Sequence, residues 1–298
     1  MIELVKDLDS RLRDVGRPRT LHEPRQASRF RADLFKFEGW TRLHRNWPNK
    51  DDAKTFSRFR DQSKELEDVL GAVDTANTLL TEASLRDIPA LVRHQAEELH
   101  SAEQELKRIL REGGWMPKLG PSRTEKIAEK LATIEWPAPN EHLKYVLTEI
   151  ANEIGAFQIR FDSELRSVLL KKKYDAEIVE NFVHEWRRQI RWFAIYLQTA
   201  RGLVALKGLP AKPSKVEAAL IEEMSGNPFA KLPMVAGARV KIDAIAYYEL
   251  TRLIDGVGKI KESAELYFGM KKRLVDSGAA SDADADAIVR KFYGDVPE

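Results

Sequence analysis

Two short segments of the sequence share one pattern of residues that could bind phosphate groups. Both read His-Glu-x-Arg-x-x-x-Arg, the first over residues 22–29 and the second over residues 184–191. Residues three or four positions apart lie on the same face of an α-helix. Each segment therefore predicts a row of cationic side chains, and the planar guanidinium of arginine donates paired hydrogen bonds to phosphate oxygens.

The candidate binding residues are the histidines and basic side chains of these two helix faces. In the second segment they lie opposite an apolar face that includes Trp186, Ile190 and Phe193, so we expect them to lie away from the core. In the first segment Pro24 suits the first turn of a helix. A nearby polyanion would favour the charged form of each histidine. The complete set is His22, Arg25, Arg29, Arg31, Lys36, His184, Arg187, Arg188 and Arg191.

Residues that favour helices fill most of the chain, and the alternating patterns typical of strands are nearly absent. Clusters of proline and glycine mark the breaks between helical segments. The sequence therefore predicts an all-α protein. The expected helices lie near 2–15, 24–46, 51–83, 85–112, 122–135, 140–172, 175–207, 214–225, 241–276 and 282–293.

A second repeated pattern supports an internal duplication. Residues 66–73, Leu-Glu-Asp-Val-Leu-Gly-Ala-Val, resemble residues 253–260, Leu-Ile-Asp-Gly-Val-Gly-Lys-Ile. Glycine inside a helix costs about 1 kcal/mol relative to alanine, so the matching Gly71 and Gly258 predict a close helix crossing in each half. We expect two pseudo-symmetric helical bundles of the four-helix type that together form one domain. The expected N-terminal and C-terminal halves are 1–150 and 151–298.

These motifs resemble those of the CHAD family, the conserved histidine α-helical domain. In that family each half begins with a helix of the form His-x-x-Arg and further basic residues, as at His22 and His184. The next helix carries a Leu-Gly signature, which residues 66–74 resemble. The resemblance implies two pseudo-symmetric four-helix bundles that bind inorganic polyphosphate through the basic residues named above.

Composition narrows the functions that the chain could have. The net charge of the 298 residues is only +2, so an anion site requires local clustering of cations. The lack of cysteine excludes disulfides, thiolate metal sites and a cysteine nucleophile. No stretch approaches the ~20 apolar residues of a membrane span, and the N-terminus does not resemble a signal peptide. We therefore expect a cytoplasmic protein without membrane contact.

No group of residues has the spacing of a catalytic, metal or nucleotide site. Glu97 and His100 form one Glu-x-x-His pair, whereas di-iron bundles need two. The sequence therefore predicts a non-enzymatic protein, without cofactor or metal, that binds inorganic polyphosphate or a similar polyanion. Two alternatives stay open: a nucleic-acid-binding protein that uses the same faces, which the sequence favours less, and a helical scaffold without anion binding.

Overall fold

The computed structural model describes residues 5–6, 8–10, 24–170, 178–200, 203–227, 230, 232 and 240–294. The chain divides into two compact units, Met1–Pro137 with Arg273–Ala280 and Ala138–Lys272 with Ser281–Glu298. This division follows Pro137, whereas the expected boundary at residue 150 falls inside a helix. The candidate His22 and most of the predicted helix at 2–15 lie outside the described residues, as do the side chains of Arg25 and Arg29.

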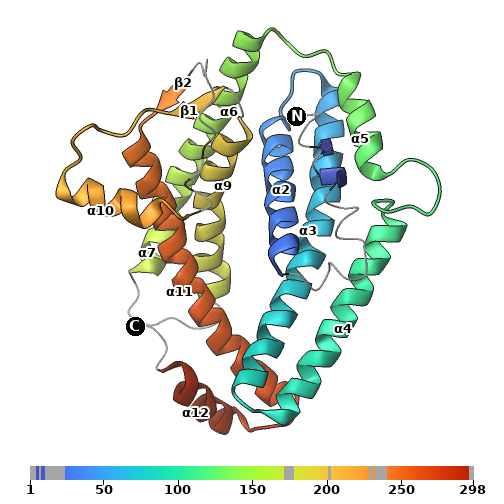
Figure 1. The fold of residues 1–298 in the computed structure, drawn as a ribbon, viewed down its shortest axis with the longest axis vertical. Helices are drawn as coiled ribbons and strands as arrows, with labels where there is room; N and C mark the ends of the chain where they lie inside the picture. Colours follow the sequence, from blue (N-terminus) through green and yellow to red (C-terminus); the bar gives the residue numbers. More distant parts are fainter. Residues whose placement is uncertain are drawn as a thin grey trace. The chain divides into compact units, whose positions relative to one another are not determined.

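The first unit is built from helices that begin and end near the predicted bounds. Asn49 accepts hydrogen bonds from two backbone N–H groups at the start of α3, and Ser122 and Glu125 form a capping box at the start of α5. The helix α3 packs against both α2 and α4 (Figure 1). These helices are α2 (Pro24–Leu43), α3 (Lys50–Leu85), α4 (Pro89–Glu112) and α5 (Arg123–Ala132).

Aromatic rings fill the core where α2 meets α3. His44 is fully buried just after α2, and its Nδ1 lies 2.7 Å from the carbonyl oxygen of Trp40. The His44 ring lies 4.3 Å from the ring of Trp40, 5.1 Å from that of Trp47 and 5.3 Å from that of Phe56, measured between centroids. Burial of these large side chains holds α2 against α3 and fixes the direction of the polar residues on both helices.

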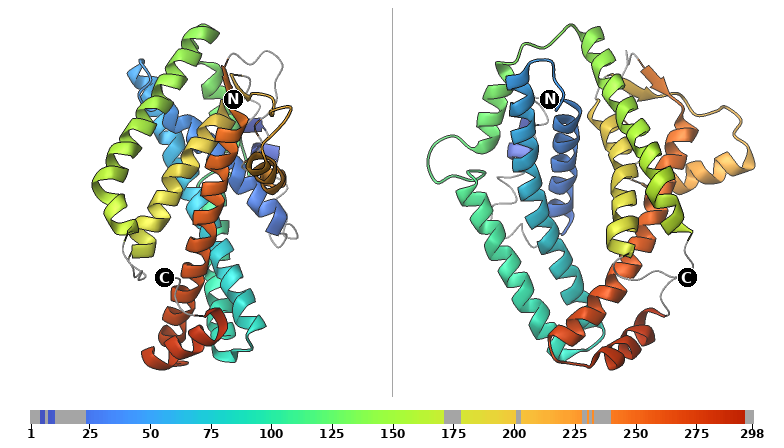
Figure 2. Two further views of the ribbon diagram at one scale, coloured as in Figure 1. Left: turned by 90° about the vertical axis from the view of Figure 1, so that its left-hand side faces the viewer. Right: turned by 180° about the vertical axis from the view of Figure 1, so that it is seen from behind.

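The second unit places α9 beside α6 and α11 (Figures 1 and 2). Its central core joins Ile190 and Ala194 of α9 to Ile254 and Val257 of α11. Phe157 of α6 packs against the same cluster. The helical elements of this unit are α6 (Pro139–Arg160), η1 (Phe161–Leu165), α7 (Arg166–Leu169), η2 (Val179–His184), α9 (Glu185–Thr199), α10 (Lys215–Met224), α11 (Ala244–Asp276, up to Lys272) and α12 (Asp282–Tyr293).

Two short strands that the sequence did not predict interrupt the helices of the second unit. Strand β1 (Val204–Leu206) pairs in parallel with β2 (Val240–Ile242), with Val204 opposite Val240. The predicted helix at 175–207 is therefore wrong at its C-terminal end, since α9 ends at Thr199. A parallel pair requires a long connection, which here includes α10. Strands of three residues are too short for an alternating pattern to reveal them.

The fold is predominantly helical, as the sequence predicts. Among the described residues, no helix combines the length and the apolar character that a bilayer crossing requires. The internal duplication into two four-helix bundles is not established by this fold and stays a prediction. The two glycines of the repeated pattern nevertheless have similar surroundings in the two units, and these surroundings define the candidate site below.

Candidate anion-binding site

One end of α9 carries all the predicted site residues of the second unit. His184 is the last residue of η2, a π-helical turn, and Arg187, Arg188 and Arg191 follow within the first two turns of α9. π-Helical turns are rare and often lie at functional sites. The apolar side of α9 packs into the core through Ile190, as predicted. The basic residues are half-buried rather than fully solvated, because neighbouring side chains cover them.

His184 and Arg188 both lie beside carboxylates. The Nδ1 of His184 lies 3.4 Å from Oε1 of Glu265, and the Nζ of Lys261 lies 2.5 Å from Oε2 of the same residue. Burial works to raise the pKa of Glu265, but His184 and Lys261 outweigh it and hold the pKa below its usual value. Arg188 donates to Glu185 at 2.8 Å, within the same helix. These cations are partly neutralised.

The guanidinium of Arg187 lies against a glycine, and its nearest described carboxylate is farther away than those beside His184 and Arg188. A Cβ atom on Gly258 of α11 would lie only 2.8 Å from Nε and 2.9 Å from Nη2 of Arg187. The side chain is 18% exposed, and the nearest carboxylate oxygen, from Glu262, lies 3.7 Å from Nη2. In the described part of the chain, the buried Nε has no acceptor within hydrogen-bond distance. The charge of Arg187 is therefore only weakly compensated by the described carboxylates.

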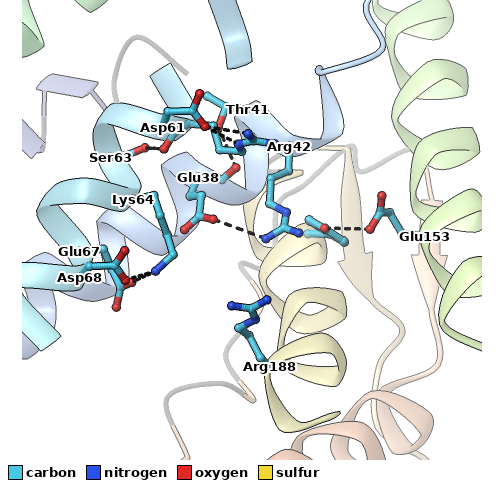
Figure 3. A network of polar contacts seen from close by, with 12 residues as sticks. Glu38, Thr41, Arg42, Asp61, Ser63, Lys64, Glu67, Asp68, Glu153 and Arg188 are labelled. Carbon is cyan, nitrogen blue, oxygen red and sulfur yellow. Dashed lines mark hydrogen bonds and ion pairs between the residues drawn. The ribbon is translucent and has the colours of Figure 1, made fainter. Parts of the chain in front are cut away.

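Arg31 lies on a glycine of the first unit in a similar way, but two carboxylates hold it. A Cβ on Gly71 would lie 3.1 Å from Nη2 of Arg31. The same Nη2 donates to buried Glu67 at 2.7 Å, and Nη1 donates to Asp74 at 3.0 Å. Lys64 also donates to Glu67, at 3.1 Å (Figure 3). Arg31 is therefore part of an internal network of charges.

The structure brings together only some of the predicted candidates of the first segment. Lys36 donates to the buried carboxylate of Asp33 at 3.1 Å, within one turn of α2. Burial works to raise the pKa of Glu67, but Arg31 and Lys64 outweigh it and lower the pKa. Arg31 and Lys36 thus each contact a buried acid, which the sequence analysis did not anticipate.

The glycines of the repeated pattern do not bring two helix backbones together. Among the described residues, the atoms nearest to a Cβ on Gly258 belong to Arg187, and those nearest on Gly71 belong to Arg31 and Glu67. The predicted close helix crossing is therefore wrong, because each glycine makes room for an arginine side chain. Sequence reasoning also missed Lys261 and Glu265. Their position three and seven residues after the repeated glycine would have placed them on its helix face.

Substitution of two glycines of α11 tests this close approach. Gly256→Ala should raise the free energy of unfolding by about 1 kcal/mol, because alanine favours a helix and the added Cβ meets no atom within 4 Å. Gly258→Ala should gain clearly less, because the guanidinium of Arg187 must move away. Urea denaturation of both variants measures the difference. Equal gains would show that Arg187 does not occupy the space at Gly258.

Comparison with protein families, with curated proteins and with solved structures found no match to this chain. The resemblance to the CHAD family therefore stays a prediction that rests on the short motifs at His22, His184 and residues 66–74. The candidate site rests on the geometry of α9 and α11.

Proposed function

We propose that this protein binds inorganic polyphosphate or a similar polyanion, without a chemical step, through the basic end of α9. The observation that carries the proposal is the guanidinium of Arg187, which lies against Gly258 and whose buried Nε has no acceptor among the described residues. In the sequence, Arg187 lies between the basic residues His184 and Arg191. A phosphate oxygen would accept from the terminal N–H groups of this guanidinium, whose nearest carboxylate oxygen among the described residues lies 3.7 Å from Nη2. The proposal is consistent with kinship to the CHAD family and with a cysteine-free cytoplasmic protein.

A linear polyanion suits this surface better than a single small ion would. Successive phosphates carry one charge each, so several cations along one helix face can contact neighbouring units of the same chain. The acid beside Arg187 competes only weakly with such a ligand, since Glu262 is 64% exposed and its Oε1 lies 3.7 Å from Nη2 of Arg187. Exposed ion pairs of this kind contribute little, so a polyanion can displace them.

A titration with polyphosphate chains of defined length tests the proposal. RNA and DNA at equal phosphate concentration serve as comparison ligands, across a series of salt concentrations. We expect saturable binding of polyphosphate that weakens steeply with salt, because counterions are released on binding. The polyphosphate recovered afterwards should have its original chain length. Stronger binding of RNA or DNA would favour the nucleic-acid alternative, and no binding to any of the three would contradict the proposal.

The ion pairs of α9 favour one other candidate, a helical scaffold without an anion ligand. Arg188 with Glu185, and His184 with Glu265, are contacts that a purely structural helix face would also form. The two candidates differ in whether Arg187 takes an external anion, since its nearest carboxylate oxygen among the described residues lies 3.7 Å from Nη2. The titration above separates them.

A further inference from the structure

We infer that the two units have diverged around the same arginine-on-glycine contact. In the second unit this contact is open to a phosphoryl anion, whereas in the first unit two carboxylates close it. The choice of a phosphoryl ligand rests on the proposed function. The divergence itself rests on the residues around Gly71 and Gly258, which are compared below one position at a time.

Both contacts have the same layout along their helices. Arg31 reaches Gly71 in the middle of α3, and Arg187 reaches Gly258 in the middle of α11. Positions four residues before and three residues after each glycine share its helix face. The residues at these two positions therefore decide what surrounds each guanidinium.

The position four residues before the glycine has changed from an acid to an aliphatic residue. In the first unit it is Glu67, which accepts from Arg31 at 2.7 Å. In the second unit it is Ile254, which is fully buried in the core between α9 and α11. The strongest partner of the first arginine thus has no counterpart for Arg187.

The position three residues after the glycine has changed from an acid to a base. In the first unit it is Asp74, which accepts from Arg31 at 3.0 Å. In the second unit it is Lys261, whose ammonium reaches Glu265 and whose side chain is 14% exposed. The face around Gly258 therefore gathers Arg187, Lys261 and, through the shared Glu265, His184.

The two exchanges together replace two carboxylates that hydrogen-bond the arginine with an aliphatic residue and a lysine. Arg31 donates to two carboxylates through Nη1 and Nη2, which balance its charge, although its buried Nε, like that of Arg187, has no acceptor among the described residues. Arg187 has only the exposed Glu262 nearby, at 3.7 Å, among the described residues. A phosphoryl group presents two oxygens at the spacing of a guanidinium fork and brings negative charge beside Arg187 and Lys261. The geometry points to an anion site at Gly258 and to a structural contact at Gly71.

Exchange of one residue between the units tests the inference. Lys261→Asp places in the second unit the acid that the first unit has, and it should weaken binding of tripolyphosphate and long-chain polyphosphate by tenfold or more. The matched control is Lys259→Asp, which makes the same change of charge at an exposed lysine of the same helix. It should weaken binding by less than about threefold. Asp74→Lys should leave the affinity unchanged. Glu262→Gln should strengthen it. Isothermal titration calorimetry measures all four variants.

A second readout follows Arg187 itself and does not depend on long polyphosphate. In ¹⁵N-labelled protein, the side-chain Nε–H signal of Arg187 should shift when tripolyphosphate is added, and that of Arg31 should not. If long chains fail to bind but this shift is seen and is lost in Lys261→Asp, the proposed function fails and the inference stands. If polyphosphate binds but Lys261→Asp and Lys259→Asp are equal, or the Arg187 signal does not move, the inference is overturned. An absence of both binding and shift would overturn both.

Discussion

Replacing Arg31 with methionine should lower the free energy of unfolding by about 3 kcal/mol, because it leaves the buried carboxylate of Glu67 without its main partner. Methionine has a similar length and favours helices, so little of the loss should come from packing or propensity. Lys64 still contacts Glu67, which keeps the loss below that of a completely unpaired charge. Urea denaturation at pH 7 measures the change.

The matched substitution Arg187→Met should change the free energy of unfolding by less than about 1 kcal/mol. Its guanidinium forms no close ion pair, so its removal leaves no buried acid behind. We therefore expect Arg31→Met to lower the free energy of unfolding clearly more than Arg187→Met does. Equal destabilisation by both would mean that Arg187 has structural partners comparable to Glu67 and Asp74.

The loss of unfolding free energy in Arg31→Met should also depend on pH, and it should become smaller in acid. Burial works to raise the pKa of Glu67, but Arg31 and Lys64 outweigh it and lower the pKa in the folded state from its ordinary 4.5. Such a carboxyl stabilises the fold above its unfolded pKa, and this contribution is lost as the pH falls through the folded pKa. The difference between wild type and Arg31→Met should therefore be full at pH 7 and shrink below pH 4.5. A difference that grows on acidification would contradict this origin.

Much of the fold could be predicted from the sequence because local signals mark the helices. Ser122 with Glu125, and Ser214 with Glu217, form capping boxes at the start of α5 and α10, where helices were expected. The pairing of β1 with β2 could not be predicted, because it depends on contacts between residues far apart in the sequence. The first unit ends at Pro137, beside a proline break that the sequence shows, but its inclusion of Arg273–Ala280 depends on contacts between residues far apart in the sequence.

The candidate site could be predicted only in part, because periodicity fixes the face of a helix and not its neighbour. The sequence placed His184, Arg187, Arg188 and Arg191 on one face of a helix, and all four lie in one segment of η2 and α9. By the repeated pattern, the sequence also pairs Arg25 with Arg187, since both are the first arginine of their segment. The structure instead gives Arg31 and Arg187 the same contact with a glycine, which only the packing of α2 on α3 and of α9 on α11 reveals.

Reversing two charges of α9 should have the largest effect on binding. Arg187→Glu with Arg191→Glu should weaken polyphosphate binding by more than about a hundredfold, because each charge-assisted hydrogen bond contributes about 1.5–3 kcal/mol and each glutamate adds repulsion. This variant should also lose some stability. Arg187 is largely buried beside Gly258 and near Glu262, so its reversal also puts two acids close together. Some loss of stability should accompany the loss of binding.

The milder pair Arg187→Met with Arg191→Met separates these two effects. It removes both guanidinium groups without adding charge, so it should keep the helical circular dichroism signal and still lose most of the affinity. The control for total charge is Arg252→Glu with Lys259→Glu, two exposed residues of α11 outside the candidate site. If this control binds as weakly as Arg187→Glu with Arg191→Glu, long-range charge governs the affinity. If the methionine pair binds like wild type, the basic end of α9 is an ordinary solvated face, and polyphosphate, if it binds, does so elsewhere.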